Sequence, residues 1–145
     1  MHLTVVNKLP DIRLAAGAVE TFGRGHGLPE RLMSRLGLAL DEVLTNLVSY
    51  GFPDGGRHEI AIHLRLAEGR LTMSVTDDGI AFNPLDLPAP DLGLAVEDRP
   101  IGGLGIHFVR TVMDEVRYTR EAGRNVLTME VAVAPPTERR GEHRA

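Results

Sequence analysis

Residues 38–52, LALDEVLTNLVSYGF, form the stretch around which the rest of the chain is arranged. Apolar residues recur in it at helical spacing, which predicts a helix with one face buried against a core. This apolar face consists of Ala39, Leu40, Val43 and Leu47. Glu42 and Asn46 stand four residues apart, so they share one side of the helix and could hold a water molecule, a metal ion or a hydroxyl group. On this helix alone, an ordinary solvent-facing polar pair is the simpler interpretation, and the rest of the chain has to decide.

The composition is typical of one globular domain and excludes several classes of site. The chain has 145 residues, of which 43% are hydrophobic and 25% charged, enough for a sizeable core. It contains no cysteine, which excludes disulfides and Cys-ligated metal clusters. The net charge of −4 and the 4% aromatic content argue against nucleic-acid binding. No membrane span or secretion signal is recognisable, so we expect a cytoplasmic protein with no membrane partner.

The remaining pattern predicts strands and helices in a single domain over residues 1–134, followed by a disordered, Pro- and charge-rich tail at 135–145. Three helices are expected: one from Pro10 to the glycines at 23–27, one from Pro29 to near Gly51, and one that follows residues 101–105. Residues 58–66 and 70–76 alternate as a hairpin. Shorter strands are expected at 2–7, 116–120 and 125–133, and residues 84–100 read as a loop.

Two tempting motifs lack the context that their chemistry requires. The run HEIAIH at 58–63 is one residue longer than a zinc-protease HExxH, and it lies in a strand, where its two histidines fall on opposite faces. The other histidines are scattered along the chain, which predicts no metal site made of histidines. The run GRGHG at 23–27 follows a helix rather than a strand, so we interpret it as a helix C-cap and loop.

Two glycine-containing motifs supply what a nucleotide needs. Asp77 at a strand end could accept a hydrogen bond from an exocyclic amine such as that of adenine. Gly79 would let the backbone approach a planar base closely. The GGLG turn at 102–105 would present free N–H groups and a helix dipole to phosphates. Asn46 could then contribute an oxygen ligand to Mg²⁺ shared with those phosphates.

In this order the motifs resemble the ATPases related to gyrase, Hsp90, histidine kinases and MutL. Glu42 and Asn46 are similar to the N box of that superfamily. Asp77, Gly79 and Phe82 are similar to its first glycine box, and GGLG to its second. The segments DEVLTN, DDGIAFNP and GGLGIHFVRTVMDEVRY most resemble the anti-sigma-factor serine kinases of bacterial partner-switching systems, the RsbW type. The resemblance extends over residues 1–133.

The resemblance implies an α+β fold, the Bergerat ATP-binding fold. In it a two-layer α/β sandwich has a mixed, mainly antiparallel sheet covered on one face by about three helices. ATP would lie between helices and sheet, with residues 84–100 as a lid. Glu42 would be the general base and Asn46 the Mg²⁺ ligand on the phosphates. The implied nucleotide contacts are Asn46, Asp77, Gly79, Ala81, Phe82, Gly102, Gly103, Leu104, Gly105 and Ile106.

The chain departs from the family pattern at three places. Relatives often carry His or Lys shortly after the N-box Asn, where this chain has Ser49 and Tyr50. Arg99 could replace the missing charge, although we favour reading it as a solvated lid residue. Residues 123–125 read Gly-Arg-Asn where many relatives have Gly-Thr, so no residue is carried over there. Ala81 replaces a frequent glycine.

The implied function is phosphorylation of a serine on a STAS-type antagonist protein, with sequestration of a sigma factor or another target. A homodimer is implied as well. The alternative is a nucleotide-sensing binding module with little or no kinase activity, which the Ser49-Tyr50 departure motivates. A catalytic fragment of a sensor histidine kinase is disfavoured, because no long two-helix segment with a phosphoacceptor histidine precedes the domain.

Overall fold

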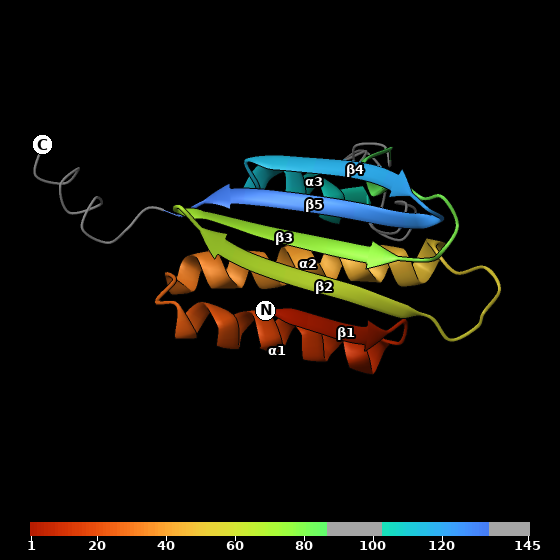
Figure 1. The fold of residues 1–145 in the computed structure, drawn as a ribbon, viewed down its shortest axis with the longest axis horizontal. Coiled ribbons are helices and arrows are strands. Elements are labelled where there is room, and N and C mark those ends of the chain that lie inside the picture. The colour runs from red at the N-terminus through yellow and green to blue at the C-terminus, as the bar shows by residue number, and fades with distance from the viewer. Residues whose placement is uncertain (87–102, 134–145) are drawn as a thin grey trace, which may run out of the picture.

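The computed structural model describes residues 1–86 and 103–133 (Figure 1). Five strands form one sheet in the order β1-β2-β3-β5-β4, and every pair of neighbouring strands in the described residues is antiparallel. The strands are β1 (His2–Val6), β2 (Glu59–Ala67), β3 (Arg70–Asp77), β4 (Glu115–Glu121) and β5 (Arg124–Ala132). The expected α+β sandwich is confirmed, with a sheet more uniformly antiparallel than the mixed one implied.

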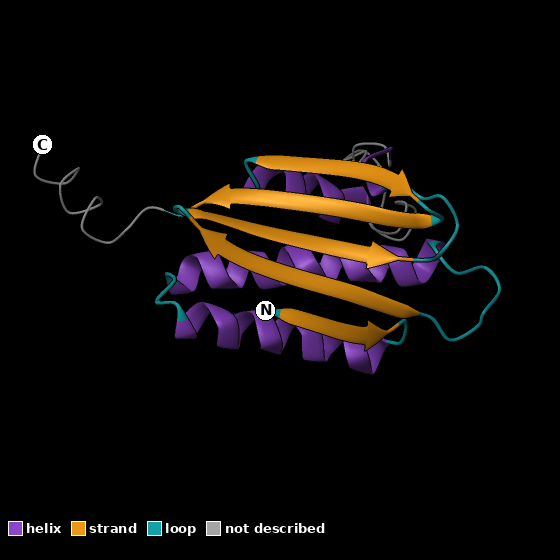
Figure 2. Ribbon diagram, viewed as in Figure 1, coloured by secondary structure: helices purple, strands orange, loops and turns teal. Residues whose placement is uncertain are grey.

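Three helices cover one face of this sheet and leave the other face open (Figure 2). They are α1 (Leu9–Gly25), α2 (Glu30–Tyr50) and α3 (Gly103–Val112). The predicted apolar stripe of α2 lies in the core, where Ala39 and Leu40 have no exposed surface. Burying one such leucine stabilises the fold by about 1.5–3 kcal/mol. None of the helices in residues 1–86 and 103–133 is both long and apolar enough to cross a membrane.

α1 ends within the glycine-rich run at 23–27, as the sequence predicts. Gly23 and Gly25 lie inside the helix, and the chain leaves it only at Gly27, whose φ is +68°. There the Leu28 N–H donates to the Gly23 carbonyl at 2.9 Å and the Gly27 N–H to the Arg24 carbonyl at 3.2 Å, which is the Schellman pattern. A Cβ at Gly23 would collide with the Met33 side chain, so Gly23 serves the packing of α1 on α2.

Several sequence expectations fall on residues that the structure does not describe. They are the tail at 135–145 together with position 134, most of the expected lid, Arg99 and Gly102. Just before residues 87–102, a short 3₁₀ helix, η1 (Pro84–Asp86), follows β3.

The hairpins β2–β3 and β4–β5 each have a two-residue turn, at 68–69 and at 122–123. Both residues of each turn have positive φ, as type I′ turns require.

Candidate functional site

Asn46 is the most unusual polar residue of the core. Its side chain, on α2, has no exposed surface. Neither its Oδ1 nor its Nδ2 atom has a hydrogen-bond partner among the described residues. Leaving a buried polar group without a partner costs about 1–3 kcal/mol, and native structures contain few such groups. A side chain kept at this cost fits a ligand-binding role, and its carboxamide oxygen suits a hard cation such as Mg²⁺.

Glu42 stands one helical turn before Asn46 and is half-buried. Burial raises the pKa of its carboxyl group, and the negative charge of the neighbouring Asp41 raises that pKa further. A raised pKa makes the carboxylate a better proton acceptor near neutral pH. The two residues singled out in the sequence therefore combine a basic carboxylate with an unsatisfied carboxamide on one helix.

Asp77 ends β3 and is also buried, with 3% of its surface exposed. Its Oδ1 atom accepts hydrogen bonds from the Gly79 N–H at 2.8 Å and from Asn125 Nδ2 at 3.0 Å. No described residue donates to its Oδ2 atom. Burial raises the pKa of Asp77, while the hydrogen bonds from Asn125 and Gly79 oppose that rise. The second oxygen is therefore available to an exocyclic amine.

Asn125 is the site residue that sequence reasoning missed. Besides holding Asp77, its Nδ2 atom donates to the Ile80 carbonyl at 2.7 Å. Its Oδ1 atom accepts from the Tyr118 hydroxyl, from Arg120 Nη1 and from the Phe82 N–H. The available signal was the alternation of β5, which places an asparagine in a row of buried apolar residues. In the sheet it stands directly opposite Asp77.

Gly79 has a structural role within the protein, in addition to the close approach to a base that the sequence predicts. A Cβ there would collide with the Gly51 carbonyl oxygen and crowd Asp77 Oδ1. The same Gly51 carbonyl accepts the Ile80 N–H at 3.0 Å. The close approach is thus between two loops of the protein, the one after α2 and the one after β3, and this contact positions Asp77.

A small cavity of about 20 Å³ lies beside Asp77 between α2 and the sheet. This volume is about that of one water molecule, so an adenine ring can enter only when the lining side chains move apart. Phe82 belongs to the lining, and its ring centre lies 5.6 Å from that of Tyr50. Ala81 is exposed and is not part of the lining. The lining residues are Val43, Leu47, Val75, Asp77, Phe82, Pro84, Tyr118, Asn125 and Leu127.

The second glycine motif begins a helix, as expected. α3 starts at Gly103, so Leu104 and Gly105 lie in its first turn. The first four N–H groups of a helix have no intrahelical partner, and such groups can donate to an anion. Ile106 contributes its side chain to the core, so only its backbone could contact a nucleotide.

His58 links the loop after α2 with the loop after β3. Its Nε2 atom lies 2.8 Å from Asp54 Oδ2, its Nδ1 atom lies 2.9 Å from Asp78 Oδ1, and its ring stacks on Phe52. The hydrogen bonds to Asp54 and Asp78 raise the pKa of His58, which favours the charged imidazolium.

Ser49, at the position where the resemblance leads us to expect a cation, is exposed.

The chain is similar to several known proteins. Residues 5–131 match the family of histidine kinase-like ATPase domains. The chain is 36% identical over 107 residues to the serine/threonine-protein kinase BtrW of Bordetella bronchiseptica, covering 72% of this chain and 74% of that protein. It is 32% identical over 99 residues to the serine-protein kinase RsbW of Bacillus mycoides, covering 66% of this chain and 61% of that protein.

Two solved structures share the fold. One contains the RsbU and RsbW domains of a Mycobacterium tuberculosis protein, with a TM-score of 0.64 at 18% identity, covering 94% of this chain and 33% of that one. The other is the SiaB-SiaC complex of Pseudomonas aeruginosa, with a TM-score of 0.56 at 14% identity, covering 92% and 89%.

Proposed function

Because the chain belongs to the histidine kinase-like ATPase domain family, among the RsbW-type serine kinases, we propose that it phosphorylates a serine of a partner protein with ATP. It is an ATP-dependent protein kinase. The observation that carries this function is the buried Asn46 beside Glu42, whose carboxamide has no hydrogen-bond partner in residues 1–86 and 103–133. A solvent-facing polar pair, the simpler interpretation from the sequence, would leave the Asn46 carboxamide exposed, whereas it is fully buried.

The described side chains divide the work of phosphoryl transfer. Asp77, fixed by Asn125 and Gly79, accepts a hydrogen bond from the adenine amine through its second oxygen. The N–H groups at the start of α3 bind phosphate oxygens. Asn46 holds Mg²⁺, which when bound neutralises charge on the phosphates. Glu42 accepts the proton of the serine hydroxyl while its oxygen bonds to the γ-phosphorus, and the bond between that phosphorus and ADP breaks.

The partner proposed is a STAS-type antagonist protein. Two relatives are named serine or serine/threonine kinases, and the SiaB-SiaC structure shows a protein of this fold in a complex, which supports a partner-binding role. We also propose that the chain sequesters a sigma factor or another target. It would act as a homodimer in the cytoplasm.

A transfer assay tests the proposal. We expect the chain, incubated with Mg²⁺, γ-labelled ATP and a STAS-type antagonist protein from the same organism, to place label on a serine of the antagonist. The label should be lost when that serine is replaced by alanine. Absence of transfer, with antagonist affinity that still differs between ADP and ATP, would favour a second function, a nucleotide-sensing module. The exposed Ser49 in place of a cation motivates that alternative.

Asp77→Asn should separate base recognition from folding. Asparagine can still accept the hydrogen bonds of Gly79 and Asn125 through its oxygen, but it presents an N–H group to the adenine amine. We expect ATP to bind roughly 10- to 150-fold more weakly, the size of a lost hydrogen bond to a charged group. Calorimetric titration measures this loss, and unchanged affinity would remove Asp77 from the adenine site.

The same variant has a pH signature in stability. The folded-state pKa of Asp77 is raised, so the folded protein holds this proton more tightly than the unfolded chain. The stability of the native protein relative to Asp77→Asn is therefore greatest below the unfolded pKa, about 3.9, and falls as pH rises through the folded-state pKa. Thermal melts of both proteins across that range check the sign.

A further inference from the structure

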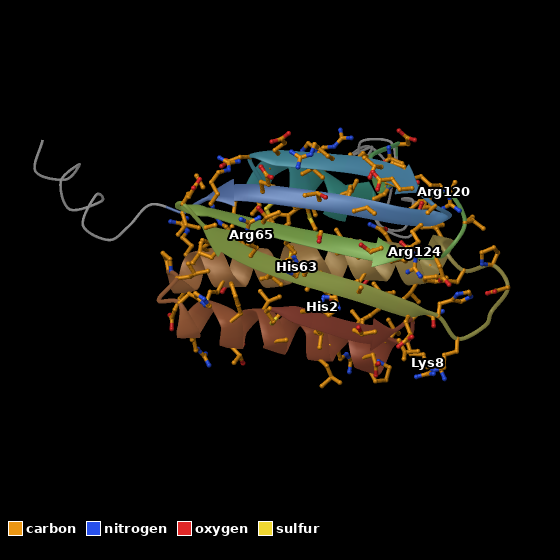
Figure 3. All side chains as sticks on the ribbon, in the orientation of Figure 1. His2, Lys8, His63, Arg65, Arg120 and Arg124 are labelled. Atoms are coloured by element: carbon orange, nitrogen blue, oxygen red, sulfur yellow. The ribbon has the colours of Figure 1, made fainter. Side chains whose placement is uncertain are left out.

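The antiparallel pairing of β1 with β2 brings together two histidines that are far apart in the sequence. His2 and His63 are directly opposed cross-strand partners, and both lie on the open face of the sheet (Figure 3). Next to them, Met1 and Leu64 exchange two backbone hydrogen bonds, of 2.7 and 2.9 Å. Hydrogen-bonded and non-hydrogen-bonded pairs alternate, so His2 and His63 form a non-hydrogen-bonded pair, in which side chains come closest.

The two imidazole rings stand at a distance suited to sharing one ion. Their centres are 6.1 Å apart with planes inclined by 52°, and both residues are exposed. A Zn²⁺–N bond is about 2.0–2.1 Å, so two rings on one ion have their centres about 5–6 Å apart. Rotation of exposed side chains readily covers the difference. We propose that His2 and His63 form a two-imidazole site for a divalent transition metal such as Zn²⁺, Ni²⁺ or Cu²⁺.

The donor set separates this site from the nucleotide site. Imidazole nitrogen suits Zn²⁺, Ni²⁺ and Cu²⁺, whereas Mg²⁺ prefers oxygen ligands. No group of three or more His, Cys, Asp or Glu side chains suited to a metal exists in residues 1–86 and 103–133. The chain therefore supplies two ligands, and water completes the coordination. The site lies on the sheet face opposite the helices, so it does not depend on the proposed kinase function.

Arg65 is a charged side chain next to the proposed site. It stands two residues after His63 on the same face of β2, where its positive charge opposes a bound cation (Figure 3). The same three side chains could instead attract an anion such as phosphate. Removing the charge of Arg65 should have opposite effects in the two cases, because it strengthens cation binding and weakens anion binding.

Calorimetric titration of the untagged chain with Zn²⁺ and with Ni²⁺, in millimolar Mg²⁺ and without nucleotide, tests the proposal. We expect one saturable site per chain. Either His2→Gln or His63→Gln should weaken binding on the order of 100-fold, because the second imidazole binds as an intramolecular event. Arg65→Gln should strengthen it by about two- to fivefold, the size of a screened surface charge. His26→Gln, an exposed histidine at the end of α1, should leave affinity unchanged.

A second measurement is the melting temperature with and without metal, because a metal bound to both His2 and His63 links β1 to β2. A metal that binds only the folded pair raises the melting temperature, so Zn²⁺ should stabilise the native chain and His26→Gln but not His63→Gln. Since all these side chains are exposed, the metal-free variants should melt like the native chain. Absence of saturable binding, loss of binding in His26→Gln, or phosphate binding that weakens in Arg65→Gln without any metal binding would each overturn the proposal.

Discussion

Replacing Asn46 with leucine should make the nucleotide-free protein more stable and at the same time weaken its binding of ATP. The native carboxamide is buried and has no hydrogen-bond partner in the described part of the chain, and leucine has nearly the same size with no polar atom. The free energy of unfolding should rise by about 1–3 kcal/mol. Urea or thermal unfolding measures that gain. ATP binding should fall roughly 10- to 150-fold, since the variant cannot ligate Mg²⁺ or contact a phosphate.

The same substitution at Asn7 provides a matched control. Its Nδ2 atom donates to the Gly56 carbonyl at 3.0 Å, and its Oδ1 atom accepts the His58 N–H at 2.8 Å. Asn7→Leu should therefore destabilise the protein by about 1–2 kcal/mol. If Asn46→Leu is no more stable than the native chain, or if it binds Mg-ATP normally, then Asn46 is not a ligand-binding residue.

Glu42→Gln should lower the rate of phosphoryl transfer by about 10²–10⁴-fold, the usual contribution of a positioned general base. Glutamine keeps the shape of the side chain but cannot take up the serine proton. ATP affinity should change little, because the carboxylate acts on the attacking hydroxyl rather than on the nucleotide. Single-turnover transfer to the antagonist, with ATP binding measured separately, distinguishes the two effects.

The pH dependence of the native rate identifies the base independently. Transfer should fall as pH drops through the raised pKa of Glu42, because the protonated carboxyl accepts no proton. Asp41→Asn is the control: removing the neighbouring negative charge should lower the pKa of Glu42 and move the acidic limb of the profile to lower pH. If the acidic limb of the profile does not move in Asp41→Asn, or if it persists in Glu42→Gln, then a group other than Glu42 titrates in that limb.

The local order of the elements could be predicted from the sequence because each carries its own periodicity. The stripe of α2, the hairpin of β2 and β3, and the helix after the second glycine motif all follow from spacing and turn residues. Glu42 and Asn46 could also be named, since helical spacing alone puts them on one side. The partial burial of Glu42 and the complete burial of Asn46 could not be predicted, because burial depends on how the other elements pack against α2.

Contacts between distant strands account for what was missed. Asn125 reaches Asp77 because β3 and β5 are neighbours with these two residues in register, and no local pattern encodes that register. His2 and His63 looked scattered for the same reason. The role of Gly23 depends on a distant contact as well, because its missing Cβ leaves room for the Met33 side chain of α2.

The edge position of β1 has a consequence for how the protein folds. β2–β3 and β4–β5 are joined by two-residue turns, so each hairpin can form within microseconds. Among the described strands, β1 pairs with β2 alone. Residues 7–58 separate the two strands, and closing so long a loop has a large entropy cost. The contacts of β1 therefore raise the contact order of the chain and slow folding. We expect β1 to join the sheet last during refolding, and to be the first strand whose amide protons exchange with solvent.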